Sequence, residues 1–220
     1  MTKPHDTRCK GETGLAVSGS QKFFGILALI ALLVGCAQFS DAPPEEVARA
    51  RYVSDDEPYV ALFTMIRRRN DRGAHTALVV NGSQVAIYDP AGSFEHPNMP
   101  ERGDVLYGVT PVMKKIYENY HARSTVYVRE QRVPVSREFA DAVIARMEAQ
   151  GASSKAFCAI NTAEVLRDFP EFAHVPRSFY PSNIMAAFDE VPGVEERLIF
   201  AEDEGQNIDL LDDLAPVAGQ

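Results

Sequence analysis

The stretch HTALVVNGSQVAIYDPAG, residues 75–92, contains two β-rich runs separated by Asn-Gly-Ser. Valine, isoleucine and tyrosine favour strands, and Asn-Gly between two such runs is a strong hairpin signal. We therefore predict antiparallel strands at 75–80 and 84–89. The sequence Asp-Pro-Ala-Gly that follows is a turn signal and ends the second strand.

The register of this hairpin decides which side chains share a face. With a three-residue loop at 81–83, His75 lies directly opposite Asp89, close enough to hydrogen-bond. A two-residue Asn-Gly loop would pair His75 with Tyr88 and turn Asp89 to the opposite face. We favour the three-residue loop because it brings together a chemically sensible pair.

Hydrophobic periodicity predicts the elements around the hairpin. Ser136 is expected to cap one helix and Gly151 to stop it, while Cys158 stands at the head of a later amphipathic helix, AFCAINTAEVL. The predicted fold class is α+β, with an antiparallel sheet packed against helices. Further strands are expected at 59–66, 105–109, 124–135 and 194–200, and helices at 111–120, 137–150, 156–166 and 181–189.

The length and composition fit one folded domain with targeting and linking segments. The chain has 220 residues, of which 45% are hydrophobic and 24% charged. We predict a signal peptide at 1–35, a tether rich in Pro, Ser and acidic residues at 36–58, the folded domain at 59–203 and an acidic tail at 204–220.

The N-terminus carries the features of a secretion signal. Basic residues precede a thirteen-residue apolar run at 23–35, which is too short to serve as a comfortable membrane anchor, and the run stops at Cys36. The ending LVGC resembles a bacterial lipobox, which implies that Cys36 is lipidated and becomes the first mature residue. Ala37 stands where an inner-membrane retention signal usually has Asp, so the resemblance implies the outer membrane, facing the periplasm. An uncleaved anchor or a plain secreted protein is the alternative.

The charge balance excludes one class of partner. Residues 1–35 contain four basic and two acidic residues, so 18 basic and 29 acidic residues remain, and the mature net charge is about −11. A surface of that sign repels phosphate backbones, and we expect no nucleic-acid partner. The run RRRNDRG at 67–73 is predicted to be a polar loop that is either simply solvated or contacts an anion or a lipid headgroup.

Cysteine counting singles out Cys158. Cys9 leaves with the signal peptide and Cys36 is lipidated, so Cys158 has no intramolecular partner in a compartment that favours disulfides. At a helix N-terminus, unsatisfied N–H groups and the helix dipole stabilise a thiolate. A nucleophilic thiolate also needs a proton shuttle, for which a histidine oriented by a third polar group is the usual arrangement.

Three short motifs, AHTALVV, IYDPAG and FCAINTAEVL, occur in the order His, acid, Cys. This order resembles the circularly permuted papain-like cysteine hydrolases, the NlpC-like group that includes bacterial lipoproteins and relatives of lecithin retinol acyltransferase. It also occurs in adenain-like and SUMO-protease-like peptidases, although Thr76 replaces their Trp and Phe157-Cys158-Ala159 replaces their Asp-Cys-Gly. The resemblance covers about 59–189 and implies a papain-like fold with Cys158 as nucleophile, His75 as base and acid, and Asp89 as the orienting group.

Each candidate also has a plainer interpretation. Cys158 is a residue type that often fills cores, His75 could simply end a strand, and Asp89 before proline is an ordinary turn residue. His121 is an alternative base, and Gln150 an alternative oxyanion donor. No HxxxH or CxxC pattern occurs, and the remaining histidines lack ligand spacing, so we predict no metal and no cofactor.

Together these features predict a lipid-anchored envelope thiol hydrolase or acyltransferase that acts on amide or ester bonds. Its expected partners are the membrane, through the lipid anchor, and a substrate that is first a peptidoglycan stem peptide and second a lipid ester. The alternative is a non-catalytic envelope binding lipoprotein with a papain-like fold. A redox thiol is disfavoured because no resolving cysteine remains.

Overall fold

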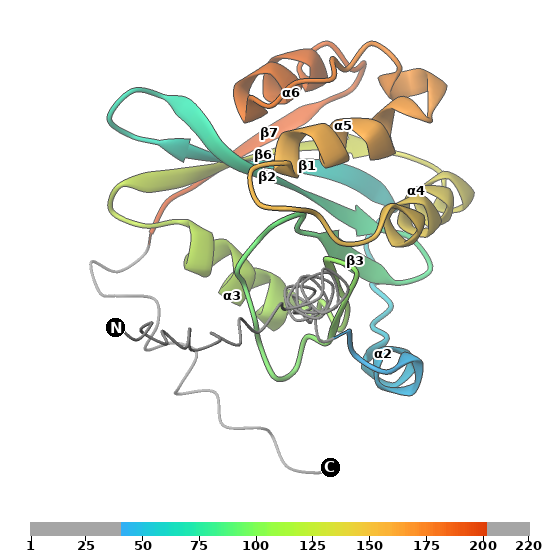
Figure 1. The fold of residues 1–220 in the computed structure, drawn as a ribbon. Helices are drawn as coiled ribbons and strands as arrows, with labels where there is room; N and C mark the ends of the chain where they lie inside the picture. Colours follow the sequence, from blue (N-terminus) through green and yellow to red (C-terminus); the bar gives the residue numbers. More distant parts are fainter. Residues whose placement is uncertain (1–40, 202–220) are drawn as a thin grey trace, which may run out of the picture. The chain divides into compact units, whose positions relative to one another are not determined.

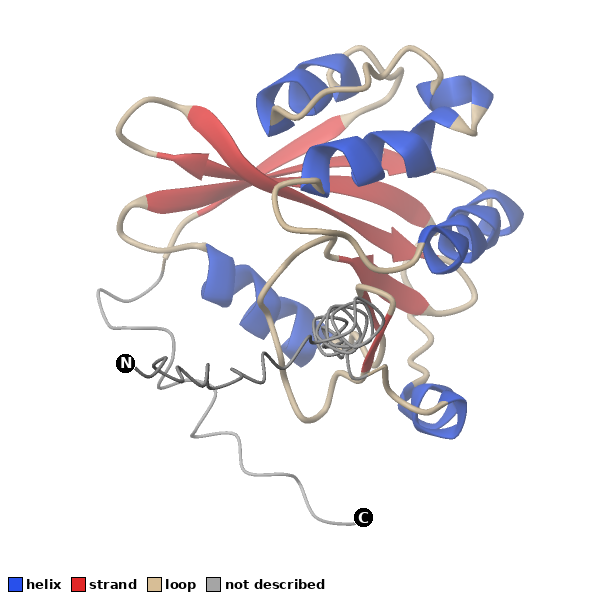
Figure 2. Ribbon diagram, in the orientation of Figure 1, coloured by secondary structure: helices blue, strands red, loops and turns tan. Residues whose placement is uncertain are grey.

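A computed structural model describes residues 41–201. The predicted signal peptide, Cys36 and the acidic tail at 204–220 lie outside the described residues. The described residues contain seven strands, five α-helices and one short 3-10 helix, and they belong to one compact unit (Figures 1 and 2). The predicted α+β class is confirmed.

The strands form one sheet in which every neighbouring pair is antiparallel. Its order is β4-β5-β3-β2-β1-β6-β7. The long predicted strands are confirmed, whereas β4 was not predicted and the strand expected at 105–109 spans only two residues. The strands are β1 Tyr59–Arg67, β2 Arg72–Asn81, β3 Val85–Tyr88, β4 Glu101–Arg102, β5 Val105–Leu106, β6 Val126–Pro134 and β7 Glu195–Ile199.

Helices cover both faces of the sheet. Helices α4, α5 and α6 lie on one face and α3 on the other (Figure 1). The predicted helices are confirmed, and a 3-10 helix at Pro170–Phe172 follows α5. The helices are α2 Pro44–Ala50, α3 Pro111–His121, α4 Arg137–Gln150, α5 Cys158–Arg167 and α6 Pro181–Phe188.

Two hydrophobic cores result from this layering. Alternate residues of a strand point to opposite faces, so Leu62 packs toward α4, α5 and α6 while Phe63 packs toward α3. Both side chains are fully buried, and burial of a side chain of this size contributes about 1.5–3 kcal/mol. Burial on both faces explains why β1 reads as a continuous apolar run rather than an alternating one.

The register of the β2–β3 hairpin differs from the predicted one by two residues. Asn81 pairs with Val85, so the three-residue loop is 82–84 rather than 81–83. Asn81 stays in the strand because its side-chain amide donates to the backbone carbonyls of Asp56 and Glu57, both at 3.2 Å. A shift of two residues preserves the face of every side chain, so His75 and Asp89 still share a face, as diagonal rather than direct neighbours.

The helix ends follow their local sequence. Ser136 Oγ accepts from the Phe139 N–H at 3.2 Å, and Gly151 ends α4 with a φ of 70°, so the predicted cap and stop are confirmed. In contrast, α5 begins at Cys158 without a side-chain cap from Phe157. The first N–H groups of α5 are therefore available for other partners.

The described part of the predicted tether is packed on the domain. Ala42 is buried and its N–H donates to the Glu101 carbonyl at 2.7 Å. Further along, the Tyr52 carbonyl accepts from Val85 N–H at 3.0 Å. Within residues 41–201, no helix combines the length and hydrophobicity required to cross a bilayer.

Candidate active site

The structure brings Cys158, His75 and Asp89 together at one edge of β2. Cys158 begins α5, His75 lies in β2, and Asp89 follows directly after β3. The ladder between β2 and β3 stops at the pair Leu78 and Tyr88, so β2 continues past the end of its neighbour. The thiol of Cys158 occupies this open edge, where it accepts the backbone N–H of Thr76.

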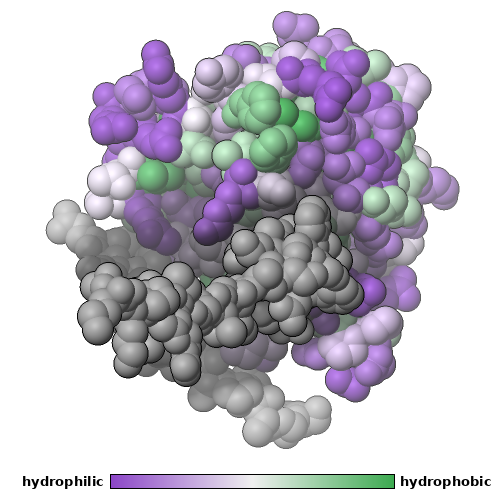
Figure 3. All heavy atoms as spheres, in the orientation of Figure 1, coloured by the Kyte–Doolittle hydropathy of each residue, from purple (hydrophilic) through white to green (hydrophobic). Residues whose placement is uncertain are grey.

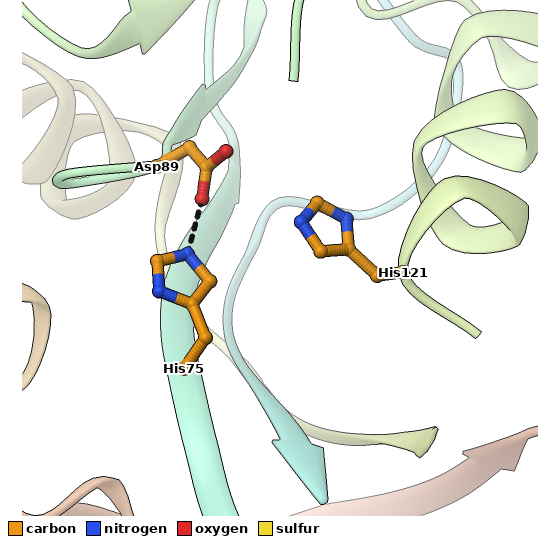
Figure 4. Close-up of side chains that lie close together, drawn as sticks. All are labelled: His75, Asp89 and His121. Carbon is orange, nitrogen blue, oxygen red and sulfur yellow. Dashed lines mark hydrogen bonds and ion pairs between the residues drawn. The ribbon is translucent and has the colours of Figure 1, made fainter. Parts of the chain in front are cut away.

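His75 and Asp89 form a direct hydrogen-bonded pair. His75 Nε2 lies 2.6 Å from Asp89 Oδ1 (Figure 4). Asp89 is buried, which by itself raises the pKa of its carboxyl, but the neighbouring His75 imidazole outweighs burial and the net pKa is lowered. Asp89 is therefore an anion that holds the imidazole and favours its protonated form.

Cys158 contacts the same imidazole from the other side. Burial raises the thiol pKa, but the hydrogen bond and charge of His75, with the N–H groups of Thr76 and Ala159, lower it overall. Burial lowers the pKa of His75, whereas Asp89 and Cys158 raise it to a net value of about 10. Because Asp89 holds Nε2, Nδ1 is the nitrogen left for sulfur. The lowered thiol pKa and the raised imidazole pKa both favour a thiolate beside an imidazolium.

A β-bulge sets the direction of His75. Met65 pairs with His75 and Ile66 with Gly73, so Ala74 is an extra residue without a partner on β1. Such a bulge bends the strand and re-aims the next side chain. The bend is held against α6, because Gly73 N–H donates to Ser182 Oγ at 2.8 Å.

A buried carboxylate that the sequence did not single out connects the two loops of the site. Asp104 Oδ2 accepts the N–H of Ala91 at 2.8 Å and of Ser153 at 2.7 Å, and its carbonyl accepts the Asp89 N–H at 2.8 Å. Asn161 on α5 donates to Ser153 Oγ at 2.6 Å. Asp104 thus ties the loop after Asp89 to the loop that leads into α5. In sequence it is only a turn aspartate, because its partners are distant along the chain.

His121 completes the surroundings of the pair. Its ring stacks on that of His75 with centroids 6.0 Å apart, and Nδ1 lies 3.0 Å from the Tyr117 carbonyl, so Nδ1 carries a proton. Burial lowers its pKa to about 4, so His121 is neutral at pH 7. The thiol of Cys158 hydrogen-bonds to His75. His75, rather than His121, is therefore the histidine positioned to exchange a proton with the thiol.

The same group of side chains is the set among residues 41–201 that could hold a metal ion. One ligand atom from each of His75, Asp89 and His121 lies within 4.8 Å of the others, a spacing that a transition-metal ion can bridge. Figure 4 shows one ring nitrogen of His121 directed toward the other two side chains. The sequence pattern gave no sign of this set, because the three residues come from separate elements.

His96, His174 and Gln150 have other partners. The Gln150 amide donates to Asn161 at 3.3 Å and to Glu164 at 3.1 Å, so it is engaged on α5 and we do not assign it to an oxyanion hole. His174 Nε2 contacts the Ala187 carbonyl at 2.9 Å, and His96 accepts from the Asn98 N–H at 3.1 Å.

The site has a cavity beside the imidazole and exposed aromatic rings next to the cysteine. A cavity of about 320 Å³ is lined by His75, His121 and Arg123, among others. On the side of Cys158, which is 8% exposed, the rings of Phe157 and Phe179 meet edge to face and are 41% and 55% exposed. Figure 3 shows hydrophobic residues on the face of the domain where Figure 1 places α5 and α6.

Comparisons of the chain with models of protein families, with curated proteins and with solved structures return no match.

Proposed function

We propose that the protein is a thiol hydrolase or acyltransferase of permuted papain-like fold. The observation that carries this proposal is the chain of contacts from Cys158 to His75 to Asp89. Three separate parts of the chain supply these side chains. The thiol has the imidazole that a nucleophile needs, and the imidazole has the carboxylate that orients it. A buried cysteine that only filled a core would need neither an imidazole nor backbone N–H donors.

The proposed reaction passes through an acyl-enzyme. The Cys158 thiolate attacks the carbonyl carbon of an amide or ester, and the electron pair of the C=O bond moves to oxygen. The N–H groups in the first turn of α5, which has no side-chain cap, would stabilise that oxyanion. His75 then gives its Nδ1 proton to the leaving group as the bond to carbon breaks. Water or another acceptor releases the acyl group by the reverse sequence.

The substrate and location are proposed from the N-terminal signal. A lipid anchor on Cys36 would hold the domain at the outer membrane, facing the periplasm, where peptidoglycan stem peptides supply amide bonds and lipids supply esters. Mass spectrometry of the membrane-extracted protein tests the anchor. We expect an N-terminus at acylated Cys36, and an unacylated N-terminus at another residue would refute lipidation.

The pH dependence of iodoacetamide labelling tests the thiol chemistry. A protein of residues 37–220 retains every described residue and lacks the signal. In this protein we expect Cys158 to label rapidly well below the ordinary thiol range, and His75→Ala to remove that reactivity. An ordinary thiol profile that His75→Ala leaves unchanged, or labelling only after denaturation, would leave a binding lipoprotein instead.

A further inference from the structure

One end of this acidic protein carries unpaired positive charge. The whole chain has a net charge of −9, yet RRRNDR at 67–72 contains four arginines and one carboxylate, Asp71. These arginines stand at the tip of the β1–β2 hairpin, and a fifth lies in the loop between α3 and β6. All five are exposed. We call them the basic end, which consists of Arg67, Arg68, Arg69, Arg72 and Arg123.

Five of the ten other arginines among residues 41–201 form ion pairs with carboxylates. Arg129 pairs with Asp189 and Glu196, and Arg197 with Glu118 and Glu130. Among residues 41–201, none of the basic-end arginines forms an ion pair with a carboxylate. Like charges this close together repel one another, so the basic end has the electrostatic character of a site that receives an anion.

The basic end adjoins the cavity beside His75. Arg67, Arg68 and Arg69 line a hollow of about 440 Å³, and Thr125 and Val126 line both this hollow and the cavity beside His75. Along β2, Arg72 precedes His75 by three positions, which corresponds to roughly 10 Å of strand. The part of a substrate that occupies the cavity beside His75 can therefore extend to the arginines.

We propose that the basic end binds an anionic group, a carboxylate or a phosphate, on the leaving-group portion of the substrate. This inference rests on the proposed function. His75 hands its proton to the leaving group and lines the cavity that leads to the arginines, whereas Cys158, which keeps the acyl group, is not among the residues that line it. Guanidinium groups bind both anions through paired N–H donors, and the hydroxyls of Ser124 and Thr125 at the hollow are further donors.

The first test compares an anionic and a neutral reagent of similar size. In the protein of residues 37–220, the ratio of iodoacetate to iodoacetamide labelling rates at Cys158 reports the local potential. At low salt, Arg67→Gln combined with Arg69→Gln should lower this ratio about 3-fold, the effect of two unit charges at roughly 10–15 Å in water. The control is Arg49→Gln on α2, at the opposite end of the view in Figure 1, which should leave the ratio unchanged.

The second test measures occupancy with inorganic pyrophosphate as the probe. Pyrophosphate should protect Cys158 from iodoacetamide in the wild type, while sodium chloride of equal ionic strength should not, and the double arginine variant should lose the protection. Equal ratios and equal protection in the wild type and the double variant would overturn the proposal. The proposal would also be overturned if vesicles of anionic lipid bind through these arginines while the labelling ratio and the protection of Cys158 are the same in the wild type and the double variant. The arginines would then face a membrane.

The two proposals fail in different ways. If Cys158 labels as an ordinary thiol and His75→Ala has no effect, the proposed function is wrong. Calorimetric titration of pyrophosphate into the wild type and the double variant still decides the anion site, because it does not depend on the reactivity of Cys158. Tight binding that requires the arginines supports the anion site, and absence of binding refutes it.

Discussion

His75 Nε2 lies 2.6 Å from Asp89 Oδ1, although the two residues are not cross-strand partners. The observed register, continued past the end of the ladder, would place Asp89 opposite Ala77, so the contact to His75 is diagonal. His75 reaches it from a strand bent by the bulge at Ala74, which explains how a hairpin with an unexpected register still assembles the expected pair.

Replacing Asp89 by Asn should keep the shape of the site and remove the charge that holds His75 protonated. We expect thiol labelling to shift toward the ordinary pH range, and substrate turnover to fall on the order of 10²- to 10⁴-fold. Asp168→Asn, which removes a surface carboxylate paired with Arg146, is the matched control and should change neither. A wild-type labelling profile in Asp89→Asn would show that the carboxylate does not tune the thiol.

The reaction rate should depend on pH through both partners of the pair. The pKa of Cys158 is lowered, so the thiolate persists below the ordinary thiol range and is lost only as the pH falls through the lowered value. His75 has a pKa of about 10, so it loses the proton that the leaving group needs as the pH rises through about 10. Turnover should therefore rise as the pH passes the lowered pKa of Cys158 and decline as it rises through about 10. A decline near pH 6.5 would mean that His75 titrates as a free histidine.

Stability should follow the same ionisations. The raised pKa of His75 contributes stability that is fully present below about pH 6.5, its ordinary value, and is lost as the pH rises through about 10. The lowered pKa of Asp89 contributes stability above its ordinary value, about 3.8, which is lost as the pH falls through the folded value. Denaturant unfolding across pH should show both losses in the wild type. Persistence of the alkaline loss in His75→Ala would assign it to another group.

Gly92 is close enough to Asp89 that a methyl group should displace the carboxylate. A Cβ at this position would lie 2.0 Å from Asp89 Oδ2 and 2.3 Å from its Cγ. Gly92→Ala should therefore abolish low-pH labelling of Cys158 and cost about 1–3 kcal/mol of stability through overpacking. Gly193→Ala, where a Cβ meets no atom within 4 Å, is the control for labelling and should preserve it, although the φ of 79° at this position adds backbone strain that lowers stability. Normal labelling in Gly92→Ala would mean that Asp89 can move without consequence.

Asp104 should act as a positioning residue. Asp104→Ala leaves the backbone N–H groups of Ala91 and Ser153 without their carboxylate partner, at a cost of about 2–4 kcal/mol. Labelling of Cys158 should lose its dependence on His75 in the folded variant, because the two loops of the site are no longer tied together. Asp104→Asn keeps an acceptor and should recover part of both effects. If Asp104→Ala loses stability but keeps the wild-type pH profile, Asp104 is structural only.

The sequence by itself determined most of the elements. The β-rich runs around Asn-Gly-Ser and the periodicity along the helices predicted the strands and helices around the site, and Cys158 at the head of α5 follows from the helical pattern. These features are local: a strand needs β-branched residues in alternation, and a helix needs a cap and a stripe. The two-residue strands β4 and β5 carry too few residues for such a signal.

Only the tertiary structure decided the details that depend on distant partners. The carbonyls of Asp56 and Glu57 hold Asn81 in the strand and thereby set the hairpin register. The clamp at Asp104 and the place of His121 beside Asp89 likewise join residues that no sequence spacing relates. The physical reason is that the hydrophobic pattern, with a period of two in a strand and 3.6 in a helix, indicates which side chains of one element share a face. Which residues then meet across the fold depends on packing and hydrogen bonds between separate elements.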